Sequence, residues 1–170
     1  MNFILAQVLG LFALISVCIG YFLKQKPHFL ISQIIGNLFY SLAFFVVEAY
    51  VGGVLVMVSL ARCIYLYYAE KYNFKYTKPL LSIFIVLFIT FGIIFYDTPY
   101  DFIPIITGTI FTISYSLKNL QTMKYLLILP NTMLVIYNIL CTTYTNAILD
   151  IIEVIVIIVA IIKFKRKRMA

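Results

Sequence analysis

Charged residues, tryptophan and histidine are scarce or absent in this sequence. Only 11% of the 170 residues are charged, and there is one histidine and no tryptophan, whereas about a quarter of the residues in a soluble domain carry a charge. A lone histidine, His28, cannot hold a metal ion. Cys18, Cys63 and Cys141 lie inside apolar runs, without the paired spacing of a disulfide framework. These shortages exclude a soluble domain, and we expect neither a metal nor another cofactor.

Apolar residues make up 64% of the chain and fall into seven runs, each of roughly the 20 residues that cross a bilayer as a helix. Charged or turn-forming clusters such as Gly52-Gly53 and Pro99 separate the runs, and only short connectors remain. Because tryptophan is absent, we expect tyrosines to anchor the helices at the membrane interfaces. The pattern predicts an all-α polytopic membrane protein with seven transmembrane helices, at residues 2–23, 29–48, 51–69, 79–96, 102–118, 124–143 and 146–163.

Basic residues predict the orientation of these helices. The net charge is +7, and 12 of the 13 lysines and arginines lie in alternate connectors or in the tail. Positively charged connectors stay in the cytoplasm, so we expect an outside N-terminus and a cytoplasmic C-terminus in a bacterial plasma (inner) membrane. Because these residues are spread over short connectors, nucleic acid is excluded as a partner. The positions are Lys24 and Lys26; Lys71, Lys75 and Lys78; Lys118 and Lys124; and Lys163, Lys165, Arg166, Lys167 and Arg168.

The chain also contains an internal repeat. Shifting it by 94 residues aligns 18–71 with 112–165, and ten of the 54 pairs are identical, including Tyr21 with Tyr115 and Asn37 with Asn131. Low complexity alone is the alternative explanation. Two units of three helices joined by one linker helix have the same orientation, which predicts two parallel three-helix bundles. The expected parts are a first repeat at 1–70, a linker region at 71–100, a second repeat at 101–163 and a basic tail at 164–170.

Polar side chains inside the apolar runs are the candidate functional residues. Ionisable groups are costly inside hydrocarbon, which singles out Arg62, Asp150 and Glu153. The repeat aligns Glu153 with Ser59, one helical turn from Arg62, so we expect Arg62 to pair with Glu153 across the two units. One hypothesis is a layer near the middle of the membrane that binds a small polar solute through Asn37, Ser59, Arg62, Asn131, Asn138, Asp150 and Glu153. The other is a structural ion pair with interhelical amide bonds, which docks the units without a solute.

The pattern resembles two groups of membrane proteins. Its 3+1+3 plan, outside N-terminus and polar third helices are similar to the SWEET, SemiSWEET and PQ-loop transporters, which implies transport through a site between the repeats. The chain departs from them because its first and fifth helices have no Pro-Gln pair. It more closely resembles the YgjV family of bacterial inner-membrane proteins, a resemblance that implies a membrane topology in the bacterial envelope and no particular substrate. The residues that carry it are Ala6-Gln7 followed by Gly10, Arg62, Gly108-Thr109 after an Ile-Pro-Ile run, Asn138 and Glu153.

Two classes of function follow from the sequence. The first is a transporter that moves a small polar solute by rocking one bundle against the other, with Glu153 as a candidate for proton coupling. The second is a non-transporting module in the lipid bilayer, such as a sorting receptor, a sensor or an assembly partner. No nucleophile-base constellation or glycine-rich phosphate loop is found, so we do not expect an enzyme. The substrate, and whether the protein forms a homo-oligomer, are left open.

Overall fold

The computed structural model describes residues 2–72, 78–94, 96 and 98–169. Within these ranges the chain forms seven α-helices and one short 3-10 turn, η1, and no strand, so the predicted all-α fold is confirmed. The bounds are α1 (Asn2–Phe22), α2 (Lys26–Val46), α3 (Tyr50–Lys71), α4 (Lys78–Ile94), η1 (Pro99–Asp101), α5 (Phe102–Ser116), α6 (Leu120–Leu140) and α7 (Tyr144–Met169).

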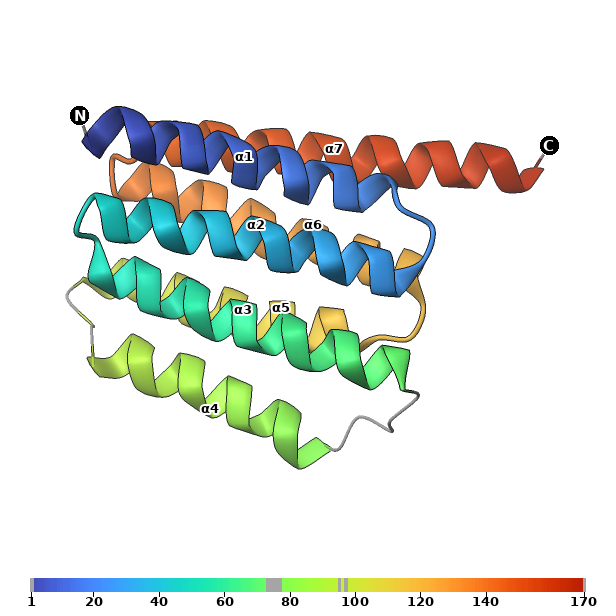
Figure 1. Ribbon diagram of the computed structural model, residues 1–170, viewed down its shortest axis with the longest axis horizontal. Coiled ribbons are helices and arrows are strands. Elements are labelled where there is room, and N and C mark those ends of the chain that lie inside the picture. The colour runs from blue at the N-terminus through green and yellow to red at the C-terminus, as the bar shows by residue number, and fades with distance from the viewer. Residues whose placement is uncertain (1, 73–77, 95, 97, 170) are drawn as a thin grey trace.

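The helices form two layers of three, with α4 at one edge (Figure 1). In one layer α2 lies between α1 and α3, and in the other α6 lies between α5 and α7. The layers meet where α1 contacts α7 and where α3 contacts α5, while α4 packs against α5 and α3. Corresponding helices run in the same direction, and the two termini lie at opposite ends of the molecule. We call α1–α3 the first triplet and α5–α7 the second triplet.

The two triplets share an unusual turn geometry. Glu48, after α2, and Thr142, after α6, have φ angles of 61° and 57°, a left-handed conformation that is uncommon for residues other than glycine. In both turns the backbone N–H of the next residue donates to a carbonyl five residues back, Ala49 to Phe44 at 2.9 Å and Thr143 to Asn138 at 2.8 Å. The positions differ by the 94 residues of the repeat. The same turn therefore closes each triplet at the end that contains the N-terminus.

The outer surface of the molecule is apolar and part of its interior is polar. Large apolar side chains are exposed on every helix, for example Ile15 on α1 and Ile148 on α7. Buried polar residues include Arg62, Asn131 and Glu153. This distribution is typical of helices that face lipid. By length and composition alone, four helices in the described ranges can each cross a membrane, at Ile4–Phe22, Lys26–Val46, Gly52–Lys71 and Leu120–Leu140.

Small side chains let α1 and α2 approach closely. Ser16 Oγ donates to Ser32 O at 2.9 Å, and Ser32 Oγ donates back to Ser16 O at 2.6 Å. One turn further along α1, a Cβ on Gly20 would meet Ser32 Oγ, and a Cβ on Gly36 of α2 would lie 2.5 Å from Val17 Cγ2. Small residues with reciprocal hydroxyl bonds are a common way to join membrane helices. The contact fixes α1, and with it Tyr21, against α2.

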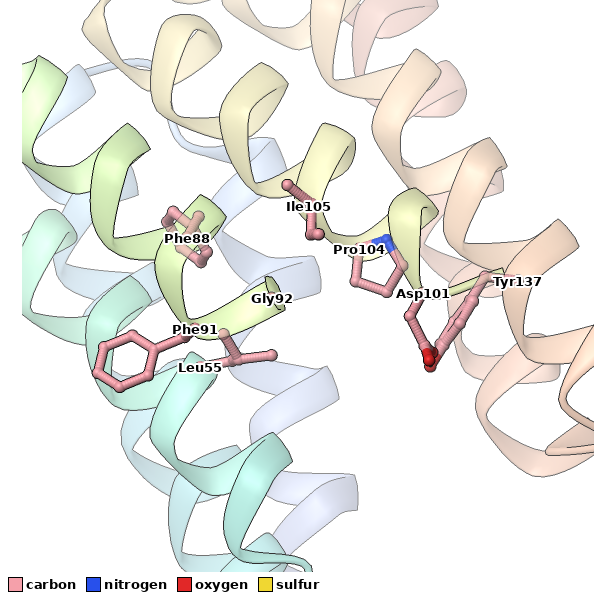
Figure 2. A pocket seen from close by; sticks show the side chains of 8 residues that line it. All are labelled: Leu55, Phe88, Phe91, Gly92, Asp101, Pro104, Ile105 and Tyr137. Atoms are coloured by element: carbon pink, nitrogen blue, oxygen red, sulfur yellow. The ribbon is translucent and has the colours of Figure 1, made fainter. Parts of the chain in front are cut away.

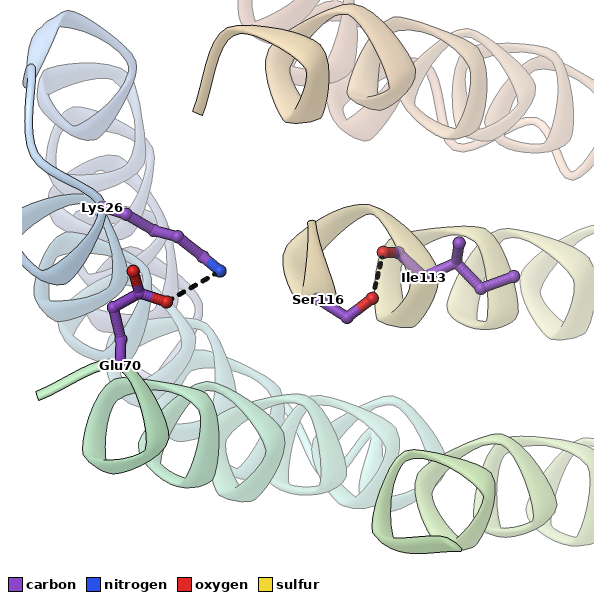
Figure 3. A network of polar contacts seen from close by, with 4 residues as sticks. All are labelled: Lys26, Glu70, Ile113 and Ser116. Carbon is purple, nitrogen blue, oxygen red and sulfur yellow. Dashed lines mark hydrogen bonds and ion pairs between the residues drawn. The ribbon is translucent and has the colours of Figure 1, made fainter. Parts of the chain in front are cut away.

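Serine and threonine hydroxyls on α5 bond to the backbone of their own helix. Thr112 and Ser114 donate to the carbonyl oxygens four residues earlier, at 2.8 and 2.7 Å. Ser116 Oγ donates to Ile113 O at 2.6 Å in the last turn (Figure 3). These local bonds satisfy polar groups that would be costly in an apolar surrounding, so α5 tolerates its high hydroxyl content.

Two buried lysines lie at the end of the molecule that contains the C-terminus. Lys26 Nζ lies 3.1 Å from Glu70 Oε2, and this ion pair joins the start of α2 to the end of α3 (Figure 3). Lys124 Nζ donates to Leu23 O at 3.3 Å and lies 4.2 Å from the centre of the Phe164 ring. Lys124 therefore links α6 to the end of α1 and to α7, across the two triplets.

Candidate functional site

Glu153 on α7 is a buried carboxylate whose hydrogen-bond donors are tyrosines. Its side chain is 8% exposed. Tyr21 on α1 donates its hydroxyl to Oε2 at 3.5 Å, and Tyr40 on α2 donates to Oε1 at 3.4 Å. Both distances are long for a hydrogen bond between a hydroxyl and a carboxylate. Two helices of the first triplet thus hold the acid of the second triplet by weak bonds.

Arg62 on α3 is a buried cation held mainly by α5. Nη1 donates to Thr112 Oγ1 at 3.0 Å and to Gly108 O at 3.3 Å. The guanidinium carbon lies 5.0 Å from the centre of the Tyr115 ring and 5.3 Å from that of Phe88, within the range of a cation–π contact. Nε is buried and has no hydrogen-bond partner. Arg62 therefore docks the first triplet on the second without using its full donor capacity.

The predicted ion pair between Arg62 and Glu153 is wrong. In the described part of the chain, no carboxylate lies within 4.0 Å of the guanidinium, and the ion pair that forms is Lys26 with Glu70. Aromatic rings separate the two charges instead, because Phe29 contacts both Tyr21 and Tyr115 with ring centroids 5.7 Å apart in each case. Each charge is thus held by its own polar and aromatic neighbours rather than by the other.

The repeat explains how the rings are placed. Tyr21 and Tyr115 are equivalent residues of α1 and α5, and each faces the third helix of the opposite triplet, Tyr21 toward Glu153 and Tyr115 toward Arg62. Tyr115 also donates its hydroxyl to Gln33 Oε1 at 3.2 Å. The two halves therefore present the same aromatic side chain to charges of opposite sign. We call Tyr21, Gln33, Tyr40, Arg62, Thr112, Tyr115 and Glu153 the polar layer.

Asn37 and Asn131 take equivalent positions, and each donates to the backbone carbonyl one turn back in its own helix. Asn37 Nδ2 donates to Gln33 O at 2.8 Å, and Asn131 Nδ2 donates to Leu127 O at 2.7 Å. Asn37 Nδ2 also lies 3.7 Å from Cys63 Sγ on α3. Asn37 thus joins α2 to α3 as well as bonding within α2, whereas the bond of Asn131 stays within α6.

The remaining predicted residues are not bonded to the polar layer. Asn138 Nδ2 donates to Asp150 Oδ2 at 2.6 Å, and Thr143 Oγ1 donates to Asn138 Oδ1 at 2.8 Å. These three residues form a separate polar cluster at the turn between α6 and α7. Ser59 is partly buried on α3 and forms no hydrogen bond with a described residue.

Sequence reasoning missed the tyrosines of the polar layer. Tyrosine counts as apolar in a hydropathy pattern and was expected at the membrane interfaces, so Tyr21, Tyr40 and Tyr115 were not candidates. The identity of Tyr21 and Tyr115 in the repeat is the signal that could have identified two of them. Gln33, on α2, accepts the hydrogen bond from Tyr115 of α5.

Two cavities are lined by residues outside the polar layer. One, of about 80 Å³, is lined by Leu55, Phe88, Phe91, Gly92, Asp101, Pro104, Ile105 and Tyr137 (Figure 2). The other, of about 270 Å³, lies at the α6–α7 turn and is lined by Thr142, Thr143, Tyr144 and Asn146. Asn37, Asn131 and Glu153 line neither of them.

Residues 4–168, nearly the whole chain, match the protein family described as Imp-YgjV, bacterial inner membrane protein. None of the curated proteins or solved structures compared with the chain matches it, and a SWEET-like architecture therefore has no support beyond the sequence pattern. The family match agrees with the apolar outer surface, the helices that are long enough to cross a membrane and the buried charges. The chain belongs to the Imp-YgjV family of bacterial inner membrane proteins.

Proposed function

We propose that this protein moves a small polar solute across the inner membrane through the polar layer between its two triplets. The observation that carries the proposal is that Arg62 and Glu153 are both buried where the triplets meet and are not paired with each other. Burying an ionisable group in a membrane is costly and is typical of a functional pathway. Two unpaired charges of opposite sign are better suited to a polar ligand than to holding helices together.

The packing supports a rocking movement of one triplet against the other. The triplets approach most closely along two lines, α1 with α7 and α3 with α5. The bonds that hold Glu153 to the first triplet are long, at 3.5 Å from Tyr21 and 3.4 Å from Tyr40. Parallel repeats are related by an axis along the membrane normal, with the shared site between them. Opening one end while the other stays closed would expose the polar layer to each side in turn.

The orientation we propose follows from the basic connectors. Three lysines lie at the end of the molecule that contains the C-terminus. Lys26 begins α2, Lys118 follows α5 and Lys124 lies near the start of α6. Basic connectors remain in the cytoplasm. The N-terminus then faces outside, together with the turns at Glu48 and Thr142.

Uptake by reconstituted protein tests the proposal. A screen of small polar metabolites with protein in lipid vesicles should identify a solute whose uptake needs the protein. Glu153→Gln should then abolish that uptake or uncouple it from a proton gradient, because the side chain keeps its shape but loses its charge. Glu48→Gln, which changes an exposed acid outside the polar layer, serves as the matched control. Uptake by Glu153→Gln at the wild-type rate would reject the role of Glu153.

A second candidate is a non-transporting membrane module, such as a sorting receptor, a sensor or an assembly partner. The observation that favours it is that Asn37, Asn131 and Glu153 line neither cavity. In that case the charges serve only to specify how the triplets dock. Absence of uptake for every solute, with a folded protein in the vesicles, would favour the module over the transporter.

A further inference from the structure

The hydrogen bonding of Arg62 is incomplete. The residue is 3% exposed, and its Nη1 donates to two uncharged oxygens, Gly108 O and Thr112 Oγ1. Its Nε is buried without an acceptor, and no carboxylate of the described chain lies within 4.0 Å. A buried guanidinium is stabilised when a carboxylate completes its donors, because such charge-assisted bonds are about twice as strong as neutral ones. The site therefore lacks a negatively charged acceptor.

A cavity reaches the aromatic ring that covers Arg62. Figure 2 shows the cavity of about 80 Å³ among α3, α4 and α5, with Phe88 in its wall. The centre of the Phe88 ring is 5.3 Å from the guanidinium carbon of Arg62. The ring also packs against Gly108, where an added Cβ would lie 2.7 Å from Phe88 Cδ1. The Phe88 ring is thus shared by the cavity wall and the cover of the cation, and a ligand that contacts both must displace this ring.

We propose that Arg62 binds the carboxylate of a short-chain monocarboxylate whose hydrocarbon part occupies this cavity. The inference rests on the proposed function and names the substrate class. Leu55, Phe91 and Ile105 make the wall largely apolar, which suits an alkyl chain and not a sugar. The volume of about 80 Å³ suits a small ligand.

The charges around the cavity restrict the ligand further. The positive charge of Arg62 disfavours a cation. Asp101 lies in the cavity wall, where its Oδ1 accepts a hydrogen bond from Tyr137 at 3.1 Å. The Asp101 carboxylate repels negative charge, so it disfavours a ligand that carries a further negative charge besides the carboxylate bound by Arg62. A single carboxylate on a short apolar chain satisfies both conditions.

Binding of radiolabelled butyrate to the purified full-length protein in lipid nanodiscs tests the inference. We expect saturable binding that neither butan-1-ol nor butylammonium displaces at the same concentration. Arg62→Gln should weaken the binding by about tenfold or more, because a hydrogen bond to a charged group contributes about 1.5–3 kcal/mol. Lys71→Gln removes an exposed cation from the same helix, and this control should bind as the wild type does. No saturable binding by the wild type, or equal binding by Arg62→Gln, would overturn the inference.

A second variant keeps the test decisive if Arg62→Gln does not fold. Leu55→Phe enlarges a side chain in the cavity wall and leaves Arg62 in place, so it should also weaken butyrate binding. Unchanged binding by Leu55→Phe would contradict the placement of the ligand.

Uptake assays separate the two proposals. Butyrate that binds but is not transported refutes the transport function alone. Uptake of another solute, with no butyrate binding, refutes the monocarboxylate inference alone.

Discussion

Lys26 and Lys124 show how a charged side chain is kept inside an apolar helix bundle. Lys26 is 4% exposed and is paired with Glu70, whereas Lys124 is fully buried and donates to Leu23 O, near the end of α1. The carbonyl end of a helix carries partial negative charge, which favours a cation there. Both lysines therefore join helices, in addition to adding positive charge at one end of the molecule.

At the residue scale, we expect Tyr115→Phe to destabilise the protein. The change removes the hydroxyl that donates to Gln33 Oε1 at 3.2 Å, and Gln33 Nε2 already lacks a partner. The free energy of unfolding should fall by about 1 kcal/mol, the scale measured for hydrogen bonds between membrane helices. Unfolding by denaturing detergent measures the effect. Tyr125→Phe, at a tyrosine on α6 that is 54% exposed, is the control. Equal stability of the two variants would show that the Tyr115 bond contributes nothing.

The sequence identifies the charged residues of the polar layer but not their partners. Arg62 and Glu153 stand out because ionisable groups are rare in apolar runs, and both are buried. Their partners depend on how α1 and α5 are rotated, which hydropathy does not determine. Tyr21 and Thr112 bond to these charges only because the two layers bring α1 to α7 and α3 to α5. The assignment of the predicted residues to a solute remains a prediction.

At the scale of the element, hydropathy predicted all seven helices, with bounds that differ by a few residues. The largest difference is at the end of α7, predicted at residue 163 and found at Met169. The starts of α2 and α6 also differ, predicted at residues 29 and 124 and found at Lys26 and Leu120. Pro27 in the first turn of α2 favours an early start. Asn119 caps α6 by accepting from the backbone of Gln121 at 2.9 Å. Lysines near these two helix starts lower the local hydropathy, so the hydropathy pattern placed both starts a few residues too late.

The close contact of α1 with α2 gives a prediction at this scale. Gly20→Ala should lower the free energy of unfolding by about 1–3 kcal/mol, the usual cost of overpacking. The new Cβ would meet Ser32 Oγ, which is already bonded to Ser16 O. Detergent unfolding measures the change. Gly10→Ala on the same helix is the control, because a Cβ there meets nothing within 4 Å. This variant should be as stable as the wild type or more so. If Gly20→Ala is as stable as Gly10→Ala, the close contact is not needed.

At the scale of the whole molecule, the orientation can be tested by labelling single cysteines in cells, with the three native cysteines replaced. Tyr100 in η1 is 45% exposed, and Lys118, between α5 and α6, is exposed at the opposite end. We expect a membrane-impermeant maleimide to label Tyr100→Cys in intact cells. Lys118→Cys should react only after the cells are permeabilised. The reverse pattern would place the basic connectors outside and overturn the proposed topology.

The repeat predicted how the helices of the molecule are arranged better than it predicted which side chains contact the buried charges. Sequence identity at a shift of 94 residues indicated two triplets of the same orientation, and the helix directions and the turns at Glu48 and Thr142 agree with it. It did not predict that each triplet is a flat layer, because that depends on which helix faces match. The residue boundaries proposed for the repeats stay a prediction.

The position of α4 bears on how such a chain could have arisen. The helix packs at the edge against α5 and α3, while the contacts between the triplets, α1 with α7 and α3 with α5, exclude it. A gene encoding a single triplet would therefore suffice to form a symmetric pair of separate chains with both contact lines. If two such triplets are joined in one chain, a single linking helix such as α4 lets the second triplet begin at the same end of the molecule as the first. Freed from symmetry, each copy could then acquire a charge of its own, Arg62 in one and Glu153 in the other.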